Sequence, residues 1–160
     1  MRNKIALLLL IILLIAGCVW YFNQPASTTY KVIAISDGDT VAVLCSNNEQ
    51  IKVRLAEIDA PEKKQAFGTK AKEALADKIF DKEIRLEGTK KDRYGRVIGK
   101  IYLGDRYINE EMIAEGWAWH YTEYSKSPEL EAAQQHAKKH KLGLWADADP
   151  TPPWEFRKKK

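Results

Sequence analysis

The fold is decided by residues 30–58, which read YKVIAISDGDTVAVLCSNNEQIKVRLAEI. Short β-branched runs are separated here by turn-forming residues at 37–39 and 46–48, and both interruptions favour tight hairpins. We therefore expect consecutive antiparallel strands. These strands are expected at residues 30–35, 40–44 and 51–58.

Two more strands and three helices are expected downstream. Apolar residues at helical spacing predict the helices, while Gly116 suits a helix stop and Ser127-Pro128 a helix start. The expected helices span 67–80, 109–115 and 128–141, and the expected strands span 84–87 and 96–102. Strands followed by helices in a small domain indicate an α+β fold. We expect a five-stranded OB-fold β-barrel with about three packed helices.

The amino terminus has the pattern of an export signal or a membrane anchor. Arg2 and Lys4 precede an uncharged run from Ile5 to Phe22, which is near the lower limit for a spanning helix. Residues 15–18 end in Cys18 and resemble a bacterial lipoprotein signal, in which that cysteine carries lipid. The basic residues place the rest of the chain outside the cytoplasm, whether it is lipidated, anchored or secreted.

The chain divides into a leader, a linker, a folded domain and a tail. We place the signal or anchor at 1–22, a short linker at 23–29, the folded domain at 30–147 and a proline-containing basic tail at 148–160. The run from Arg157 to Lys160 is expected to be solvated. A net charge of +4 is too small to argue for nucleic acid, so local placement of charge must carry that inference.

Three segments place charge where a β protein does not need it: residues 37–40, 54–62 and 92–96. Hydrolysis of a phosphodiester needs a base for water, a cation on the phosphoryl oxygen and donors for the developing charge. Asp39 and Asp59 supply the hard oxygens that Ca²⁺ prefers, and Glu62 is close enough in sequence to orient water. Arg54 and Arg96 suit bidentate recognition of phosphate.

Strand alternation sets a condition on this site. In a regular strand, Arg54 and Asp59 point to opposite faces. Their convergence therefore requires a bend or bulge between them.

The three segments, in this order and spacing, resemble the thermonuclease family of the staphylococcal nuclease type. The likeness covers nearly all of residues 30–146. It implies that Ca²⁺ is held by Asp39, Asp59 and the backbone carbonyl of Ala60. It also implies that Glu62 activates water, that Arg54 and Arg96 bind phosphate, and that 3′-phosphate ends are released.

The resemblance further implies tyrosines that contact nucleotide. Tyr94 matches a family tyrosine and can stack on any base, while either Tyr121 or Tyr124 fits a second position. Alone, Asp37 and Gly38 are explained by hairpin chemistry, and the tryptophans by core packing.

We expect a monomeric Ca²⁺-dependent endonuclease that acts on DNA and RNA with low sequence specificity and associates with the membrane through its amino-terminal segment. The alternative is a non-catalytic nucleic-acid-binding OB module anchored at the cell envelope. A third hypothesis, a structural envelope lipoprotein, predicts no affinity for nucleic acid.

Overall fold

A computed structural model describes residues 14–15 and 29–159 of the chain. The expected signal or anchor, apart from residues 14–15, and the expected linker before Thr29 lie outside these ranges. Within the described ranges, no helix has the length and apolar character needed to cross a membrane.

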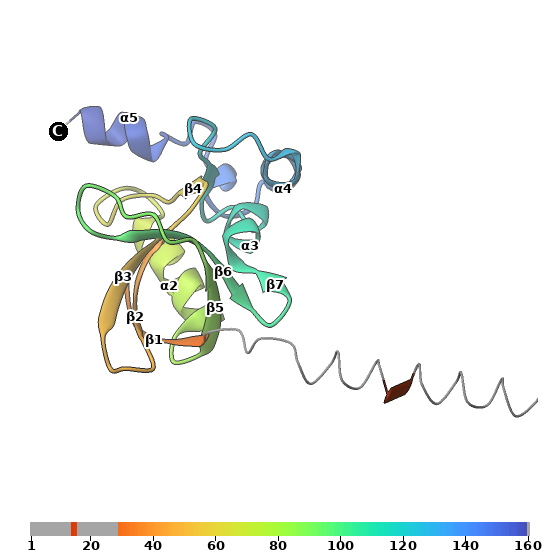
Figure 1. Cartoon of the computed structure of the whole chain (residues 1–160). Helices are drawn as coiled ribbons and strands as arrows, with labels where there is room; N and C mark the ends of the chain where they lie inside the picture. The colour runs from red at the N-terminus through yellow and green to blue at the C-terminus, as the bar shows by residue number, and fades with distance from the viewer. Residues whose placement is uncertain (1–13, 16–28, 160) are drawn as a thin grey trace, which may run out of the picture.

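Five strands of the described chain close into a barrel (Figure 1). Their order is β3-β2-β1-β5-β6, and pairing between β3 and β6 closes the ring. The β3–β6 pair is parallel, with Val53 opposite Val97, and the other pairs in the ring are antiparallel. The strands are β1 (Thr29–Asp37), β2 (Thr40–Leu44), β3 (Gln50–Leu55), β5 (Glu83–Glu87) and β6 (Val97–Leu103). The predicted α+β barrel is confirmed.

The barrel interior follows the alternation of the strands. Val32, Val41, Val43 and Ile101 are fully buried, and each such side chain contributes about 1.5–3 kcal/mol by leaving water. In β3, Arg54 lies between buried Val53 and Leu55. Alternation therefore directs Arg54 away from the core.

The three expected helices are present close to their predicted bounds, as α2 (Gly68–Ile79), α3 (Ile108–Ala114) and α4 (Pro128–Lys139). Helix α2 buries Ala71, Leu75 and Ile79 against the barrel. The Ser127 hydroxyl caps α4 by accepting the Leu130 N–H at 3.2 Å, as its position before Pro128 predicted.

The third expected strand is divided. β3 ends at Leu55, and β4 (Ile58–Asp59) pairs with β8 (Trp119–His120). The break lies at Glu57, whose φ of 67° is left-handed and turns the chain out of the strand path. The bend required between Arg54 and Asp59 is therefore present. Strand β7 (Arg106–Tyr107) pairs with the end of β6.

The proline-containing tail forms a short helix that packs on the domain. After the 3₁₀ helix η1 (Gly143–Ala146), residues 153–158 form a short helix, α5 (Pro153–Lys158), which lies over one end of the barrel near β4 (Figure 1). The Trp154 ring stacks on Tyr121, with centroids 5.4 Å apart and planes 1° apart, and meets Trp119 edge-on at 5.5 Å. These aromatic contacts dock the helix on the domain.

Candidate active site

Asp39 lies in the turn between β1 and β2 and faces inward, with 7% of its surface exposed. Its Oδ2 accepts the Ala60 N–H at 2.7 Å, and its Oδ1 accepts the Thr40 hydroxyl at 3.2 Å. The turn is pressed against its surroundings, because a Cβ on Gly38 would lie 2.7 Å from the Ala60 Cβ. Close packing, more than hairpin chemistry, therefore explains the glycine.

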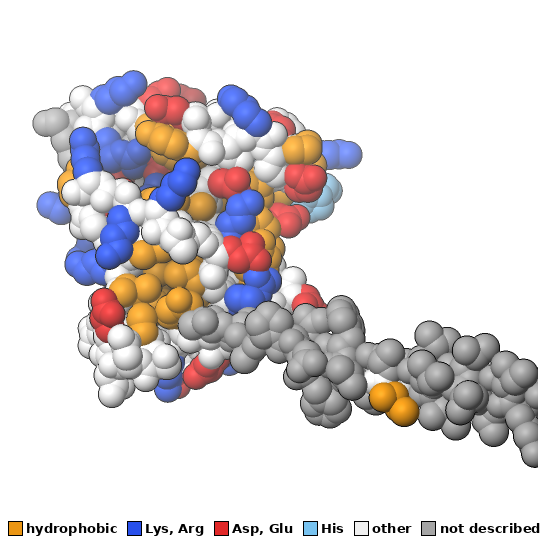
Figure 2. Space-filling view, viewed as in Figure 1, with side chains coloured by type: hydrophobic (Ala, Val, Ile, Leu, Met, Phe, Trp, Pro, Cys, Tyr) orange, Lys and Arg blue, Asp and Glu red, His pale blue; other side chains and the backbone are white. Residues whose placement is uncertain are grey.

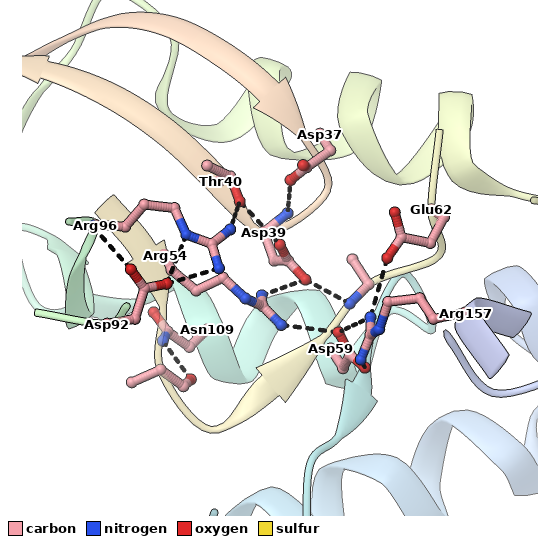
Figure 3. A network of polar contacts seen from close by, with 12 residues as sticks. Asp37, Asp39, Thr40, Arg54, Asp59, Glu62, Asp92, Arg96, Asn109 and Arg157 are labelled. Atoms are coloured by element: carbon pink, nitrogen blue, oxygen red, sulfur yellow. Dashed lines mark hydrogen bonds and ion pairs between the residues drawn. The ribbon is translucent and has the colours of Figure 1, made fainter. Parts of the chain in front are cut away.

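Arg54 joins the two predicted metal-binding aspartates (Figure 3). Its Nη1 forms an ion pair with Asp39 Oδ2, and its Nη2 donates to Asp59 Oδ1 at 2.8 Å. Asp59 is only 1% exposed. One guanidinium thus brings together a carboxylate from the β1–β2 turn and a carboxylate from β4.

The bend before Asp59 is held by residues that the sequence interpretation did not assign. Asn109, which is fully buried, donates from Nδ2 to the Ala56 carbonyl at 2.9 Å. The Glu57 carboxylate accepts the Tyr107 hydroxyl at 2.9 Å and lies 3.0 Å from the Lys100 Nζ. The sequence signal that could have indicated Asn109 is an amide residue within the otherwise apolar stripe of an expected helix, because a buried amide needs hydrogen-bond partners.

Glu62 lies in the loop between β4 and α2. Its backbone N–H donates to the Gln65 side chain at 3.1 Å, and its carbonyl accepts the Gln65 N–H at 2.8 Å. The side chain is 34% exposed, so water can reach it. This loop is compact, since a Cβ on Gly68 would lie 2.1 Å from the Glu62 carbonyl oxygen.

Arg96 is connected to the carboxylates through Thr40. Its Nε donates to Asp92 Oδ2 at 2.8 Å, and its Nη1 donates to the Thr40 hydroxyl at 3.5 Å. Burial raises the pKa of the Asp92 carboxyl, but hydrogen bonds from Arg96 outweigh burial and the net pKa is lowered. The ionised Asp92 orients the guanidinium beside the site.

The predicted nucleotide-binding tyrosines lie in two places. Tyr94 is 68% exposed, and its ring lies 5.5 Å from the Arg96 guanidinium. Tyr121 donates its backbone N–H to the Glu57 carbonyl at 2.9 Å, which places it beside the bend. Tyr124 meets the Tyr121 ring edge-on at 4.8 Å. The structure therefore groups Tyr94 with Arg96, and the other two with the bend.

Arg157 of α5 completes the polar network, which was not expected (Figure 3). Its Nη2 donates to Asp59 Oδ2 at 2.9 Å, and its Nη1 donates to Asp59 Oδ1 at 3.1 Å and Glu62 Oε1 at 3.0 Å. The expectation of a solvated Arg157 is wrong because these carboxylates attract its side chain. Lys158 and Lys159, the other residues of this run that the structure describes, are exposed and do not share these contacts.

Burial makes this acidic cluster costly to ionise. It raises the pKa of Asp59, although Arg157 and Arg54 act in the opposite direction. Burial, together with the neighbouring Asp39 carboxylate, raises the pKa of Asp37 to about 6. A cation close to these oxygens would offset the cost of their charge.

The donor set suits a hard cation with few protein ligands. In the described ranges, no group of three or more Asp, Glu, His or Cys side chains is arranged as a metal cage. The predicted site requires only Asp39, Asp59 and the Ala60 carbonyl, since Ca²⁺ completes its six to eight positions with waters. The Asp39 carboxylate accepts the N–H of the Asp59–Ala60 peptide, so Asp39 lies beside the segment that carries the other two groups.

Residues 52–147 match the family model described as Staphylococcal nuclease homologue. The chain belongs to this family and is a nuclease. It is 44% identical over 151 residues to an "Uncharacterized endonuclease" of Haemophilus influenzae, covering 94% of this chain and 82% of that protein. It is 38% identical over 156 residues to a "Micrococcal nuclease" of Shigella flexneri, covering 89% of each.

The matched range includes Arg54, Asp59, Glu62 and Arg96 but ends before α5. The network around Asp59 therefore combines residues of the matched range with Asp39, which precedes it, and Arg157, which follows it.

Proposed function

We propose that this protein is a Ca²⁺-dependent endonuclease that hydrolyses phosphodiester bonds of DNA and RNA with low sequence specificity. The observation that carries the proposal is the pairing of two buried carboxylates, Asp39 and Asp59, through Arg54. Glu62 lies beside them, linked to Asp59 by Arg157. Base, cation ligands and phosphate donors are thus available within one network.

Asp39, Asp59 and the Ala60 carbonyl would hold the calcium ion. When bound, Ca²⁺ supplies Lewis-acid polarisation of a phosphoryl oxygen. The low exposure of both aspartates, 7% and 1%, limits competition from water and strengthens their electrostatic interactions.

Glu62 takes the proton from the attacking water. Its partial exposure admits water, and the hydrogen bonds of its backbone to Gln65 hold the loop that carries it. A positioned carboxylate base contributes about 10²–10⁴-fold to a rate.

Arg54 and Arg96 bind the phosphate and offset the charge that develops as the water oxygen bonds to phosphorus and the P–O5′ bond breaks. The 5′ oxygen leaves as a hydroxyl after taking up a proton, and the phosphate stays on the 3′ oxygen. Both guanidiniums are held by aspartates, Arg54 by Asp39 and Asp59 and Arg96 by Asp92. Preorganised donors of this kind need little rearrangement during the reaction.

Low specificity follows from the groups available for binding. On the face drawn in Figure 2, Lys and Arg side chains are interspersed with Asp and Glu, without one uninterrupted basic surface. Contacts to phosphate do not distinguish sequences, and stacking on Tyr94, or on Tyr121 or Tyr124, tolerates any base.

We place the enzyme outside the cytoplasm, held by its amino-terminal segment as a lipoprotein or an anchored protein, or else secreted. The basic Arg2 and Lys4 before the apolar run support this location. Mass spectrometry of the mature amino terminus separates the three states, since only the lipoprotein begins at a modified Cys18.

A nuclease assay with Ca²⁺, followed by addition of a chelator, tests the function. We expect cleavage of single-stranded DNA and RNA to 3′-phosphate products with Ca²⁺, and loss of cleavage when the ion is removed. Undiminished cleavage in chelator would contradict the metal's part in the reaction. Salt-dependent binding without cleavage in any condition would instead favour the nucleic-acid-binding module.

A further inference from the structure

Helix α5 reaches the site from beyond the range matched to the family. Besides the contacts of Arg157 and Trp154, the chain just before the helix is attached to the Glu62 loop. The Gln65 Nε2 donates to the Thr151 carbonyl at 2.6 Å, while the Gln65 Oε1 accepts the Glu62 N–H. The tail is thus docked at three places around the active site.

Arg157 covers oxygens that a calcium ion would need. It contacts both carboxylate oxygens of Asp59 and one of Glu62, at 2.9–3.1 Å. A guanidinium and a divalent cation cannot share these positions, because they repel each other and the carboxylate has few free acceptor sites.

The contact is built so that the arginine can leave. The Arg157 side chain is 39% exposed, whereas that of Asp59 is 1% exposed. Water can solvate the departing guanidinium, but the buried carboxylate must keep a cationic partner. Arg54 alone already serves Asp39 as well as Asp59.

The same helix covers a stacking surface. Trp154 lies parallel to Tyr121 at 5.4 Å between ring centroids, the arrangement that a nucleobase adopts on an aromatic side chain. One short helix therefore places a cation at the carboxylates and an aromatic ring at the adjacent tyrosine.

We propose that α5 is a built-in competitor of calcium and nucleotide, an inference that rests on the calcium site proposed above. Arg157 neutralises Asp59 and Glu62 while the ion is absent. Calcium binding requires Arg157 to leave, and departure of the helix also exposes the Tyr121 ring to substrate.

Calorimetric titration of the full-length chain with CaCl₂ tests the competition. We expect Arg157→Gln to bind Ca²⁺ about tenfold more tightly than the wild type, because a tail that blocks the site in about nine of ten molecules reduces the apparent affinity by that factor. Lys158→Gln is the matched control, since it removes the same charge from an exposed neighbour on α5. Its affinity should change less than about twofold, as expected for a solvent-screened charge.

Trp154→Ala provides a second route to the same result. Trp154 contacts aromatic rings of the domain, and its loss weakens docking of the helix without changing the charge at the carboxylates. We therefore expect Trp154→Ala to bind Ca²⁺ about threefold to tenfold more tightly than the wild type, because lost aromatic contacts of this kind shift the docking equilibrium by about that factor.

Equal calcium affinity in the wild type and Arg157→Gln, or an equal gain in Lys158→Gln, would overturn the competition while leaving the nuclease proposal intact. Weaker binding by Arg157→Gln would overturn it as well, since Arg157 would then assist the ion. Absence of calcium binding in every variant would overturn the calcium site itself, and this inference with it.

Discussion

At the scale of single residues, Asp59 is the central group of the site. It is buried between Arg54 and Arg157, and burial raises the pKa of its carboxyl despite both arginines. The two guanidiniums offset part of the cost of its buried charge. Glu62, which is more exposed, keeps contact with water and can act on it.

We expect Glu62→Gln to lower kcat about 10²–10⁴-fold, because the amide cannot accept the proton from water.

Arg96→Ala should lower kcat about 10²–10³-fold through loss of a donor to the developing charge. Steady-state cleavage of single-stranded DNA measures both effects. Glu49→Gln, in an exposed turn, is the control and should cleave at the wild-type rate. Wild-type turnover in either site variant, with melting temperatures unchanged, would refute the assigned chemistry.

At the scale of elements, the junction between β3 and β4 brings Arg54 and Asp59 into contact. Regular strand alternation would place these two side chains on opposite faces. The left-handed Glu57 turns the chain, and Asn109 of α3 holds the turn. The Asn109 Nδ2 donates to the Ala56 carbonyl, and the Asn109 Oδ1 accepts the Ile101 N–H at 3.0 Å. Helix α3 is therefore connected to the barrel and to the site by one side chain.

Asn109→Ala should lower the free energy of unfolding by about 1–3 kcal/mol, because buried backbone groups lose their partner. It should also reduce kcat, since misplacing Asp59 by about 1 Å can cost about 10²-fold. Urea unfolding and cleavage rates, both measured where the variant is folded, test the two effects. Asn47→Ala, at an exposed turn, should change stability by less than about 0.5 kcal/mol. Full activity in Asn109→Ala would show that the bend does not depend on this amide.

Helices α2 and α3 are joined by a pH-dependent ion pair. Glu111 accepts from Arg106 at 2.7 Å and 2.6 Å and from Lys78 at 3.2 Å, and the Arg106 bond is the main cause of the lowered pKa of Glu111. Because the pKa of Glu111 is lower in the folded state than the unfolded value of about 4.5, the ionised carboxylate stabilises the fold at pH values above 4.5. This stabilisation is lost as pH falls through the pKa of the folded state.

Glu111→Gln should therefore cost about 0.5 kcal/mol at pH 7, a figure reduced for solvent screening. The difference from the wild type should shrink as pH falls through the lowered pKa of Glu111, because the protonated carboxyl no longer forms the ion pairs. Urea titrations at several pH values measure it. Glu110→Gln removes the same charge from the same helical turn and should show a smaller dependence on pH. A Glu111→Gln deficit that persists unchanged at low pH would exclude the ion pair as its cause.

At the scale of the whole molecule, folding and ion binding should be coupled, because the proposed calcium ligands come from separate parts of the chain. Asp39 lies after β1, and Asp59 lies in β4. The unfolded chain does not hold them together, so an ion that binds both stabilises only the folded state.

Calcium at a hundredfold excess over its dissociation constant should raise the free energy of unfolding by about 2.7 kcal/mol. Thermal melting monitored by circular dichroism should show the midpoint rising with Ca²⁺ and returning when chelator is added. Asp59→Asn, which removes a charged ligand, should lose most of this response. An unchanged wild-type midpoint at millimolar calcium would contradict a site formed on folding.

Much of the architecture could be predicted from the sequence. The alternation in 30–58 predicted the strands, and Ser127-Pro128 predicted the start of α4, because these patterns depend on neighbouring residues. The need for a bend between Arg54 and Asp59 also followed from strand parity. The position of the bend at Glu57 and its support by Asn109 and Tyr107 could not be predicted, because those contacts join segments that are distant in the sequence.

The sequence by itself determined the barrel, its main helices and the family-like set of charged residues, because local periodicity and short motifs carry that information. Only the tertiary structure decided which charges meet. Arg157 pairs with Asp59 across 98 residues, and the neighbouring lysines offered no local sign of that contact. The physical reason is that a buried carboxylate requires a cation, but any mobile chain segment long enough to reach it can supply one.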